Sequence, residues 1–215
     1  MKLYIDTADL ELIRPLMATG LFTGITTNPT IIRRAGITAE NRADWLAAAF
    51  DAGAEVIWQQ TWGRDLDELT RNAEWLMGLD ERVALKVPAT RDGYALASRV
   101  SRTGHPVLLT ATYSPTQIAM AAAGDIPYCA PYLGRLNDTG ADGLGVIEKM
   151  QEVLLGTGAM TELIVASIRN LDDIAALAAL GVGHVTLGEK VLRIMFDNEL
   201  TADAIEVFTK DAYGE

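Results

Sequence analysis

The chain has 215 residues, of which 49% are hydrophobic and 22% are charged, and this composition is typical of one globular domain with a substantial core. Its formal net charge of −11 at pH 7 argues against nucleic acid as a partner, because phosphates require a basic face. No stretch reaches the roughly 18 apolar residues that a membrane span needs. The segment Met1–Asp6 meets a carboxylate too early for the apolar region of a signal peptide. We therefore expect a cytoplasmic protein without nucleic-acid or membrane partners.

One cysteine and two histidines limit the chemistry that the chain can support. Cys129 has no partner for an internal disulfide and cannot build a cysteine metal site. His105 falls in a predicted helix-to-strand turn and His184 at a predicted strand start, so neither fits a histidine-rich metal centre. We expect no metal and no cofactor.

Eight short β-rich runs alternate along the chain with longer segments of helical apolar spacing. The predicted strands are Leu3–Asp6, Gly24–Thr27, Val56–Gln60, Val83–Val87, Val107–Thr110, Tyr128–Pro131, Leu163–Ala166 and His184–Leu187. The predicted helices include Asp65–Met77, Gly93–Thr103, Ser114–Ala123, Gly143–Leu155, Asp172–Leu180 and a final Leu200–Tyr213. Ser114 before Pro115, and Asn170 before Asp172, are typical helix N-caps.

Strands that alternate with helices predict parallel pairing, because each crossover between parallel strands needs a connection of helical length. Such units, in a chain of this size, are best closed as a single-domain (β/α)8 TIM barrel over residues 1–215. The segment 200–215 is then an extra helix that caps the barrel or docks on a neighbouring subunit. An open doubly wound sheet is the alternative, but Asp6-Thr-Ala-Asp9 follows the first strand instead of the usual glycine-rich loop.

In such a barrel the catalytic groups lie at the carboxyl ends of the strands. Most of the predicted strands end in groups that ionise or hydrogen-bond: Asp6, Thr26 with Asn28, Gln60, Lys86, Thr110, Tyr132 with Arg135, and Ser167 with Arg169. Loops are commonly polar, so one such residue indicates little. The set, however, contains every part that a carbonyl–amine reaction on a phosphorylated substrate needs.

Lys86 alone among the lysines lies near the end of an apolar predicted strand. If Leu85 and Val87 face the helices, strand alternation directs Lys86 into the barrel. Burial disfavours an ammonium, and the free amine is the nucleophile. A structural ion pair with Asp6 or another carboxylate is the alternative, and position alone leaves both interpretations open.

Two arginines follow late strands, where such barrels often bind phosphate. Arg135 follows the sixth predicted strand, while Ser167 and Arg169 follow the seventh. Guanidinium groups match phosphate oxygens in a bidentate manner, and a helix beginning near Asn170 adds backbone donors. For either arginine alone, a surface salt bridge is an equally good interpretation.

Several segments together resemble the transaldolase family, and most closely its small branch, which includes fructose-6-phosphate aldolases. They are Asp6-Thr7, Gly24-Ile-Thr-Thr-Asn-Pro29, Leu85-Lys-Val-Pro-Ala-Thr90, Ala130-Pro-Tyr-Leu-Gly-Arg135 and Ala166-Ser-Ile-Arg169. The resemblance spans essentially the whole chain, and the motifs keep their order and spacing.

Members of this family are (β/α)8 barrels that form an iminium between a strand-four lysine and a ketose carbonyl, so the resemblance gives this role to Lys86. It implies that Asp6 and Asn28, with Thr26 beside them, position the substrate hydroxyl groups and assist proton transfer. The residues implied for phosphate binding are Arg135, Ser167 and Arg169. Small-branch members commonly form pentamers or decamers through a C-terminal helix, which implies a homo-oligomer.

The positions that divide the branches of the family favour an aldolase. Transaldolases generally carry glutamate where this chain has Gln60, phenylalanine where it has Tyr132, and asparagine where it has Leu109. Conversely, Ser-Ile-Arg169 is more typical of transaldolases. Tyr132 is the expected base for the C4 hydroxyl, through a water held by Gln60 and Thr110.

The resulting hypothesis is a Schiff-base aldolase that splits the C3–C4 bond of a ketose phosphate such as fructose 6-phosphate into dihydroxyacetone and glyceraldehyde 3-phosphate. A transaldolase that passes the dihydroxyacetone unit to an aldose phosphate is the second hypothesis. A non-catalytic sugar-phosphate-binding barrel is a distant third, because it does not require the lysine. The expected partners are a sugar phosphate and an aldehyde acceptor.

Overall fold

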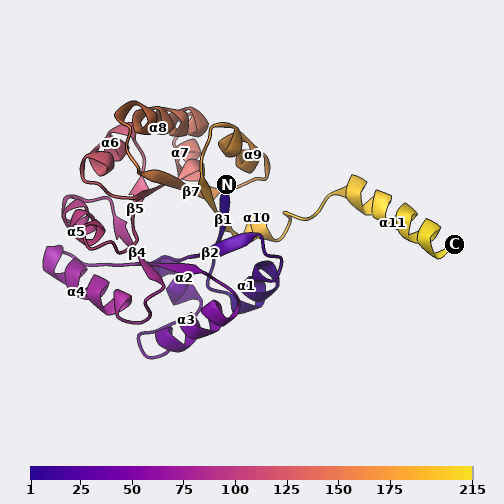
Figure 1. Ribbon diagram of the computed structural model, residues 1–215, viewed down its shortest axis with the longest axis horizontal. Coiled ribbons are helices and arrows are strands. Elements are labelled where there is room, and N and C mark those ends of the chain that lie inside the picture. The colour runs from indigo at the N-terminus through magenta and orange to yellow at the C-terminus, as the bar shows by residue number, and fades with distance from the viewer. Residues whose placement is uncertain (215) are drawn as a thin grey trace.

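The computed structural model describes residues 1–214, and its strands form one closed barrel (Figure 1). The strands are β1 (Lys2–Asp6), β2 (Phe22–Thr26), β3 (Val56–Gln60), β4 (Val83–Pro88), β5 (Val107–Thr112), β6 (Tyr128–Pro131), β7 (Glu162–Ile168) and β8 (His184–Gly188). They pair in parallel and in sequence order, and β8 closes onto β1. The predicted single (β/α)8 barrel is confirmed.

Helices surround the barrel and cover the outward face of the sheet (Figure 1). They are α1 (Leu10–Met17), α2 (Pro29–Arg34), α3 (Arg42–Asp51), α4 (Leu66–Met77), α5 (Arg91–Ser101), α6 (Pro115–Ala123), α7 (Leu133–Asp138), α8 (Gly143–Thr157), α9 (Asp172–Ala179), α10 (Glu189–Leu192) and α11 (Glu199–Tyr213). Ser114 caps α6 in a full capping box with Gln117, as its position before Pro115 predicts. At α9 the N-cap is Leu171, not Asn170, although Asn170 Oδ1 accepts a hydrogen bond from Asp173 N at 2.8 Å.

Two apolar layers follow from the alternation of side chains along the strands. The larger layer fills the space between sheet and helices, and Leu85 and Val87 of β4 are completely buried in it. The smaller layer lies inside the barrel and takes one residue from each of six strands. Its members are Tyr4, Trp58, Ala84, Leu108, Ala130 and Ile164. This inner layer fills the barrel interior. The next inward-facing position of each strand lies two residues closer to its carboxyl end.

Strands β5 and β7 run two residues beyond their predicted carboxyl ends, and each contains an irregularity there. In β5 the pairing register shifts between Thr110 and Thr112, and the intervening Ala111 has φ +60°. In β7 the register shifts between Val165 and Ile168, and Ser167 also has φ +60°. These bulges allow both strands to continue beyond the residues that face the interior.

The last helix, α11, projects away from the barrel at the end of an extended segment (Figure 1). Within Glu199–Tyr213 no residue is buried, and Leu200, Ile205 and Phe208 are among its exposed apolar side chains. The predicted extra C-terminal helix is therefore present, and it does not pack on its own barrel. Within residues 1–214, no helix combines the length and apolar character required to cross a membrane.

Candidate active site

The candidate site is the layer of inward side chains directly above the apolar inner layer. Moving two residues along each strand from that layer leads to the next inward position, because side chains alternate with a period of two. From β1 to β8 these positions are Asp6, Thr26, Gln60, Lys86, Thr110, Tyr132, Ala166 and Thr186. Six of them are predicted site residues, and the layer lies at the carboxyl ends of the strands.

Lys86 lies in the middle of this layer and is only 3% exposed. Its register partner on β3 is Gln60. Among residues 1–214, no hydrogen bond or ion pair occupies its Nζ, so the structural ion pair with Asp6 is not formed. Burial lowers the pKa of the Lys86 amine, and the charge of Asp6 opposes this only in part. A lowered pKa increases the fraction of the Lys86 amine that carries a free lone pair.

Asp6 belongs to a hydrogen-bonded chain that extends over three strands. Thr26 Oγ1 donates to Asp6 Oδ1 at 2.6 Å and lies 2.7 Å from Thr186 Oγ1. Because Thr26 has one hydroxyl proton, Thr186 must donate to Thr26. Thr186 was not singled out in the sequence, although it lies two residues beyond His184 on the predicted eighth strand. The chain fixes the carboxylate of Asp6 in the same cavity as the lysine.

Thr110 and Tyr132 form a second polar pair in this layer. Their hydroxyl oxygens are 2.9 Å apart. Burial raises the pKa of Tyr132, and the hydrogen bond with Thr110 opposes that shift. Near neutral pH Tyr132 is therefore mainly a phenol that can donate or relay a proton.

Asn28 and Gln60 offer amide groups at the β2–β3 side of the site. Asn28 caps α2, and its Oδ1 accepts hydrogen bonds from Thr30 N at 2.9 Å and Ile31 N at 3.0 Å. The cap leaves the Asn28 Nδ2 donors available. The Gln60 side chain is half-buried and has no hydrogen-bond partner within residues 1–214. Both amides can contact a bound substrate.

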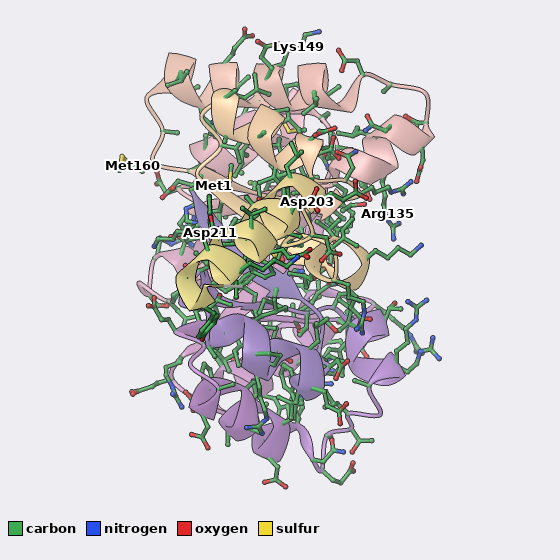
Figure 2. All side chains as sticks on the ribbon, turned by 90° about the vertical axis from the view of Figure 1, so that its right-hand side faces the viewer. Met1, Arg135, Lys149, Met160, Asp203 and Asp211 are labelled. Atoms are coloured by element: carbon green, nitrogen blue, oxygen red, sulfur yellow. The ribbon has the colours of Figure 1, made fainter. Side chains whose placement is uncertain are left out.

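Of the two arginines predicted to bind phosphate, Arg169 is ion-paired, whereas Arg135 has no ion pair within residues 1–214. Arg135 is exposed, and its guanidinium lies 5.5 Å from the ring centroid of Tyr132. Figure 2 shows Arg135 on the opposite side of the barrel from Met1 and Met160, which precede β1 and β7. Arg135 therefore lies at the end of the barrel that carries Lys86.

Arg169 instead makes a bidentate ion pair with Asp138 at the exposed end of α7. It packs closely over Gly134, where a Cβ atom would lie 2.5 Å from Arg169 Nε. Ser167 is half-buried, and its hydroxyl has no hydrogen-bond partner within residues 1–214. Phosphate binding by Arg169 thus requires competition with Asp138.

Metal-binding side chains do not gather in the described chain. Residues 1–214 contain no group of three His, Cys, Asp or Glu residues placed to hold a metal ion. His184 lies at the amino end of β8, where its Nε2 is 2.8 Å from Glu162 Oε2 and its Nδ1 is 3.3 Å from the Tyr4 hydroxyl. The hydrogen bonds and burial of His184 are those of a structural residue.

Comparisons with known proteins agree with this geometry. The sequence model of the family described as Transaldolase/Fructose-6-phosphate aldolase matches residues 3–213. A protein named probable transaldolase from Methanococcus maripaludis is 33% identical over 213 residues, covering 98% of this chain and 97% of its own length. A probable transaldolase from Syntrophobacter fumaroxidans is also 33% identical, over 98% of this chain and 96% of its own length.

A solved structure of a mandelate oxidase variant shares the fold with a TM-score of 0.58. It is 17% identical, and the alignment covers 88% of this chain and 64% of that one. At this identity the likeness concerns the barrel alone.

Proposed function

The chain belongs to the transaldolase/fructose-6-phosphate aldolase family, and from this premise we propose that it is a Schiff-base aldolase acting on a ketose phosphate such as fructose 6-phosphate. Family membership supports an enzyme of the aldolase or transferase type. The observation that carries the proposal is Lys86, a buried inward lysine whose Nζ has no partner within residues 1–214. A non-catalytic sugar-phosphate-binding barrel gives no reason for that lysine.

In the proposed reaction the neutral amine of Lys86 attacks the C2 carbonyl of the ketose. Loss of water then gives a protonated imine, whose positive charge accepts the electron pair of the C3–C4 bond as that bond breaks. Asp6 and Asn28 hold the substrate hydroxyl groups, with Thr26 and Thr186 fixing the carboxylate. The phosphorylated aldehyde leaves, and an enamine of dihydroxyacetone remains on Lys86.

The C4 hydroxyl must lose its proton while the C3–C4 bond breaks. We assign the proton transfer to Tyr132, through a water held by Gln60 and Thr110. Because burial raises the pKa of Tyr132, the phenolate that accepts this proton is a minor form near neutral pH. The same phenol is suited to protonate the enamine carbon, and hydrolysis of the imine then releases dihydroxyacetone.

The aldolase assignment rests on Gln60 and Tyr132, which resemble the fructose-6-phosphate aldolases. Leu109 contributes nothing to it, because Leu109 is buried in the outer layer and Leu108 is the inward residue before Thr110. A transaldolase remains the second candidate, since the relatives just described are named probable transaldolases. The two activities share every step up to the enamine and differ in whether water or a second aldehyde consumes it.

Borohydride reduction in the presence of fructose 6-phosphate tests the common step. We expect a covalent mass increase on Lys86, because reduction converts the imine to a stable secondary amine. Lys86→Met is the control and should remain unlabelled. An unlabelled native protein would remove both enzymatic candidates.

Release of free dihydroxyacetone, measured with and without erythrose 4-phosphate, separates the two candidates. An aldolase should release dihydroxyacetone without the acceptor. Turnover only in the presence of the acceptor would instead establish the transferase.

We also propose that α11 mediates homo-oligomer formation, in the pentamers or decamers common in the small branch of the family. The exposed apolar side chains of α11 and its distance from its own barrel support this (Figure 1). Removal of residues 199–215 should reduce the mass measured by light scattering to that of a monomer. An unchanged mass would contradict the assignment.

A further inference from the structure

Arg42, the first residue of α3, is a buried arginine without an acidic partner. It is 8% exposed, and its guanidinium lies 5.8 Å from the ring centroid of Trp62 and 5.4 Å from that of Trp75. Within residues 1–214, no carboxylate lies within ion-pair distance of it, and its Nε has no hydrogen-bond partner. An arginine stays charged in proteins, so this positive charge is buried and uncompensated.

The one hydrogen bond of this guanidinium runs to a neutral amide. Arg42 Nη1 donates to Gln59 Oε1 at 3.4 Å, which is long for such a bond. Gln59 Nε2 donates to Thr27 Oγ1 at 2.9 Å, and Thr27 Oγ1 donates to Trp58 O at 3.0 Å. This chain of bonds fixes the Gln59 amide with its oxygen toward Arg42. The remaining guanidinium N–H groups have no partner in the described chain.

Arg42 lines a cavity of about 330 Å³ between α2, α3 and the end of β3. The other polar lining groups include Asn28, Arg33 and Gln60, while Ile37 and Trp62 form apolar walls. None of the residues that line the cavity is acidic. The cavity therefore combines a buried positive charge with enough room for an anionic group of a metabolite.

The cavity adjoins the site at Lys86. Gln60 lines the cavity and is the register partner of Lys86, and Asn28 belongs to both spaces. Gln59, however, faces away from the interior that holds Lys86, so its partner Arg42 lies on the helix side of β3. An anion held by Arg42 is therefore bound apart from the carbonyl that meets Lys86.

We propose that Arg42 forms an anion-binding subsite, which takes a phosphate or carboxylate group of a ligand in this cavity. The shared chemistry is an anionic oxygen group held by guanidinium N–H donors. Anion binding at this subsite does not rest on the proposed Schiff-base function.

Tryptophan fluorescence provides a direct binding test, because Trp62 and Trp75 flank Arg42. The Arg135→Gln protein, which lacks the arginine beside Tyr132, is titrated with inorganic phosphate and separately with acetate. We expect a saturable fluorescence change for at least one anion. Gln59→Glu places a carboxylate beside Arg42 without opening a cavity. It should weaken anion binding about tenfold or more, because the carboxylate takes the guanidinium donors that the anion would use.

Gln151→Glu on α8 is the matched control, because it makes the same change of charge far from α3. It should leave the anion affinity unaltered. The Arg42→Gln variant should lose the fluorescence change, and if it does not fold, Gln59→Glu still decides the outcome. Equal affinity in the Gln59→Glu and Gln151→Glu proteins, or no saturable response to either anion, would overturn the subsite.

Discussion

Both ends of the barrel interior contain buried polar side chains, but these side chains differ in whether they have hydrogen-bond partners. At the amino end, His184 is hydrogen-bonded on both ring nitrogens, to Tyr4 and Glu162. At the carboxyl end, Lys86 is equally buried and has no partner within residues 1–214. Burial alone therefore does not distinguish a structural polar group from a reactive one. The missing partner of Lys86 becomes informative together with its position, because the amine faces the polar layer at the carboxyl ends of the strands, where catalytic groups of such barrels lie.

The largest effect on turnover is expected when the amine of Lys86 is removed. Lys86→Met should reduce turnover by at least roughly three orders of magnitude, since no other residue can form the imine. Steady-state release of dihydroxyacetone from fructose 6-phosphate measures this. Lys190→Met, at an exposed position of α10, is a matched control that should retain activity.

Lys86→Met should also raise the stability of the fold. The buried amine has a depressed pKa in the folded state, so the unfolded chain binds more protons between that pKa and the ordinary 10.5. The free energy of unfolding of the native protein should therefore rise with pH in that window and fall as the pH is lowered. The change is at most about 1.4 kcal/mol for each unit by which folding lowers the pKa. Urea unfolding at several pH values should show a flatter profile for Lys86→Met. A steeper profile would contradict the depressed pKa.

The Thr110–Tyr132 pair provides the next largest effect. Tyr132→Phe should slow C3–C4 cleavage by about 10²- to 10⁴-fold, because it removes the proton carrier. Imine formation should change less, since the amine of Lys86 does not depend on Tyr132. Single-turnover cleavage is compared with the rate of borohydride labelling by dihydroxyacetone. Equal loss in both measurements would refute the role of Tyr132 in proton transfer.

At the amino end of the barrel, replacement of His184 should lower the stability of the fold and change turnover little. His184→Ala leaves the Tyr4 hydroxyl without its histidine partner and opens a cavity, so the free energy of unfolding should fall by about 2 kcal/mol. Turnover per folded molecule should stay near that of the native protein. Denaturant unfolding and activity below the transition measure the two quantities. A loss of turnover larger than the loss of folded protein would show that the amino end affects catalysis.

The smallest effect is expected at the rim of the barrel, where Asp138 forms an ion pair with Arg169. Asp138→Asn removes the ion pair and frees the guanidinium for phosphate, so KM for fructose 6-phosphate should fall by roughly two- to fivefold, in line with the small contribution of exposed pairs. KM for dihydroxyacetone as a donor should not change, because it has no phosphate. A rise in KM for the phosphorylated substrate would indicate that Asp138 positions Arg169 for binding.

Strand alternation explains how much of the fold and site the sequence predicts. Eight apolar runs define the strands, and counting by two from Lys86 identifies Gln60 rather than Gln59 as the inward residue. Thr186 was missed because the sequence was read at the strand ends and not along the inward faces. The positions of these residues follow from a local period, which one chain reveals without any tertiary information.

The remaining features depend on contacts between segments far apart in sequence. Arg42 meets Trp75 only because α3 and α4 pack on neighbouring strands, and Arg169 meets Asp138 across two loops. No residue range was predicted for α1, α2, α3, α7 or α10. Of these, α1 contains Pro15, and α2 has six residues. No local sequence pattern indicates which arginine has a carboxylate partner. The residues that bind phosphate could therefore be predicted only as a set of candidates.

The left-handed backbone at Ala111 and Ser167 has a consequence for engineering the barrel. A residue other than glycine in this conformation costs roughly 1–2 kcal/mol, whereas glycine adds about 0.5–1 kcal/mol of unfolded-chain entropy. Ala111→Gly should therefore change stability little or raise it slightly. The native pairing of β5 and β7 holds both residues against their own preference. The ends of β5 and β7 therefore hold a strained backbone in the folded chain, and the pairing of these strands with their neighbours maintains that strain.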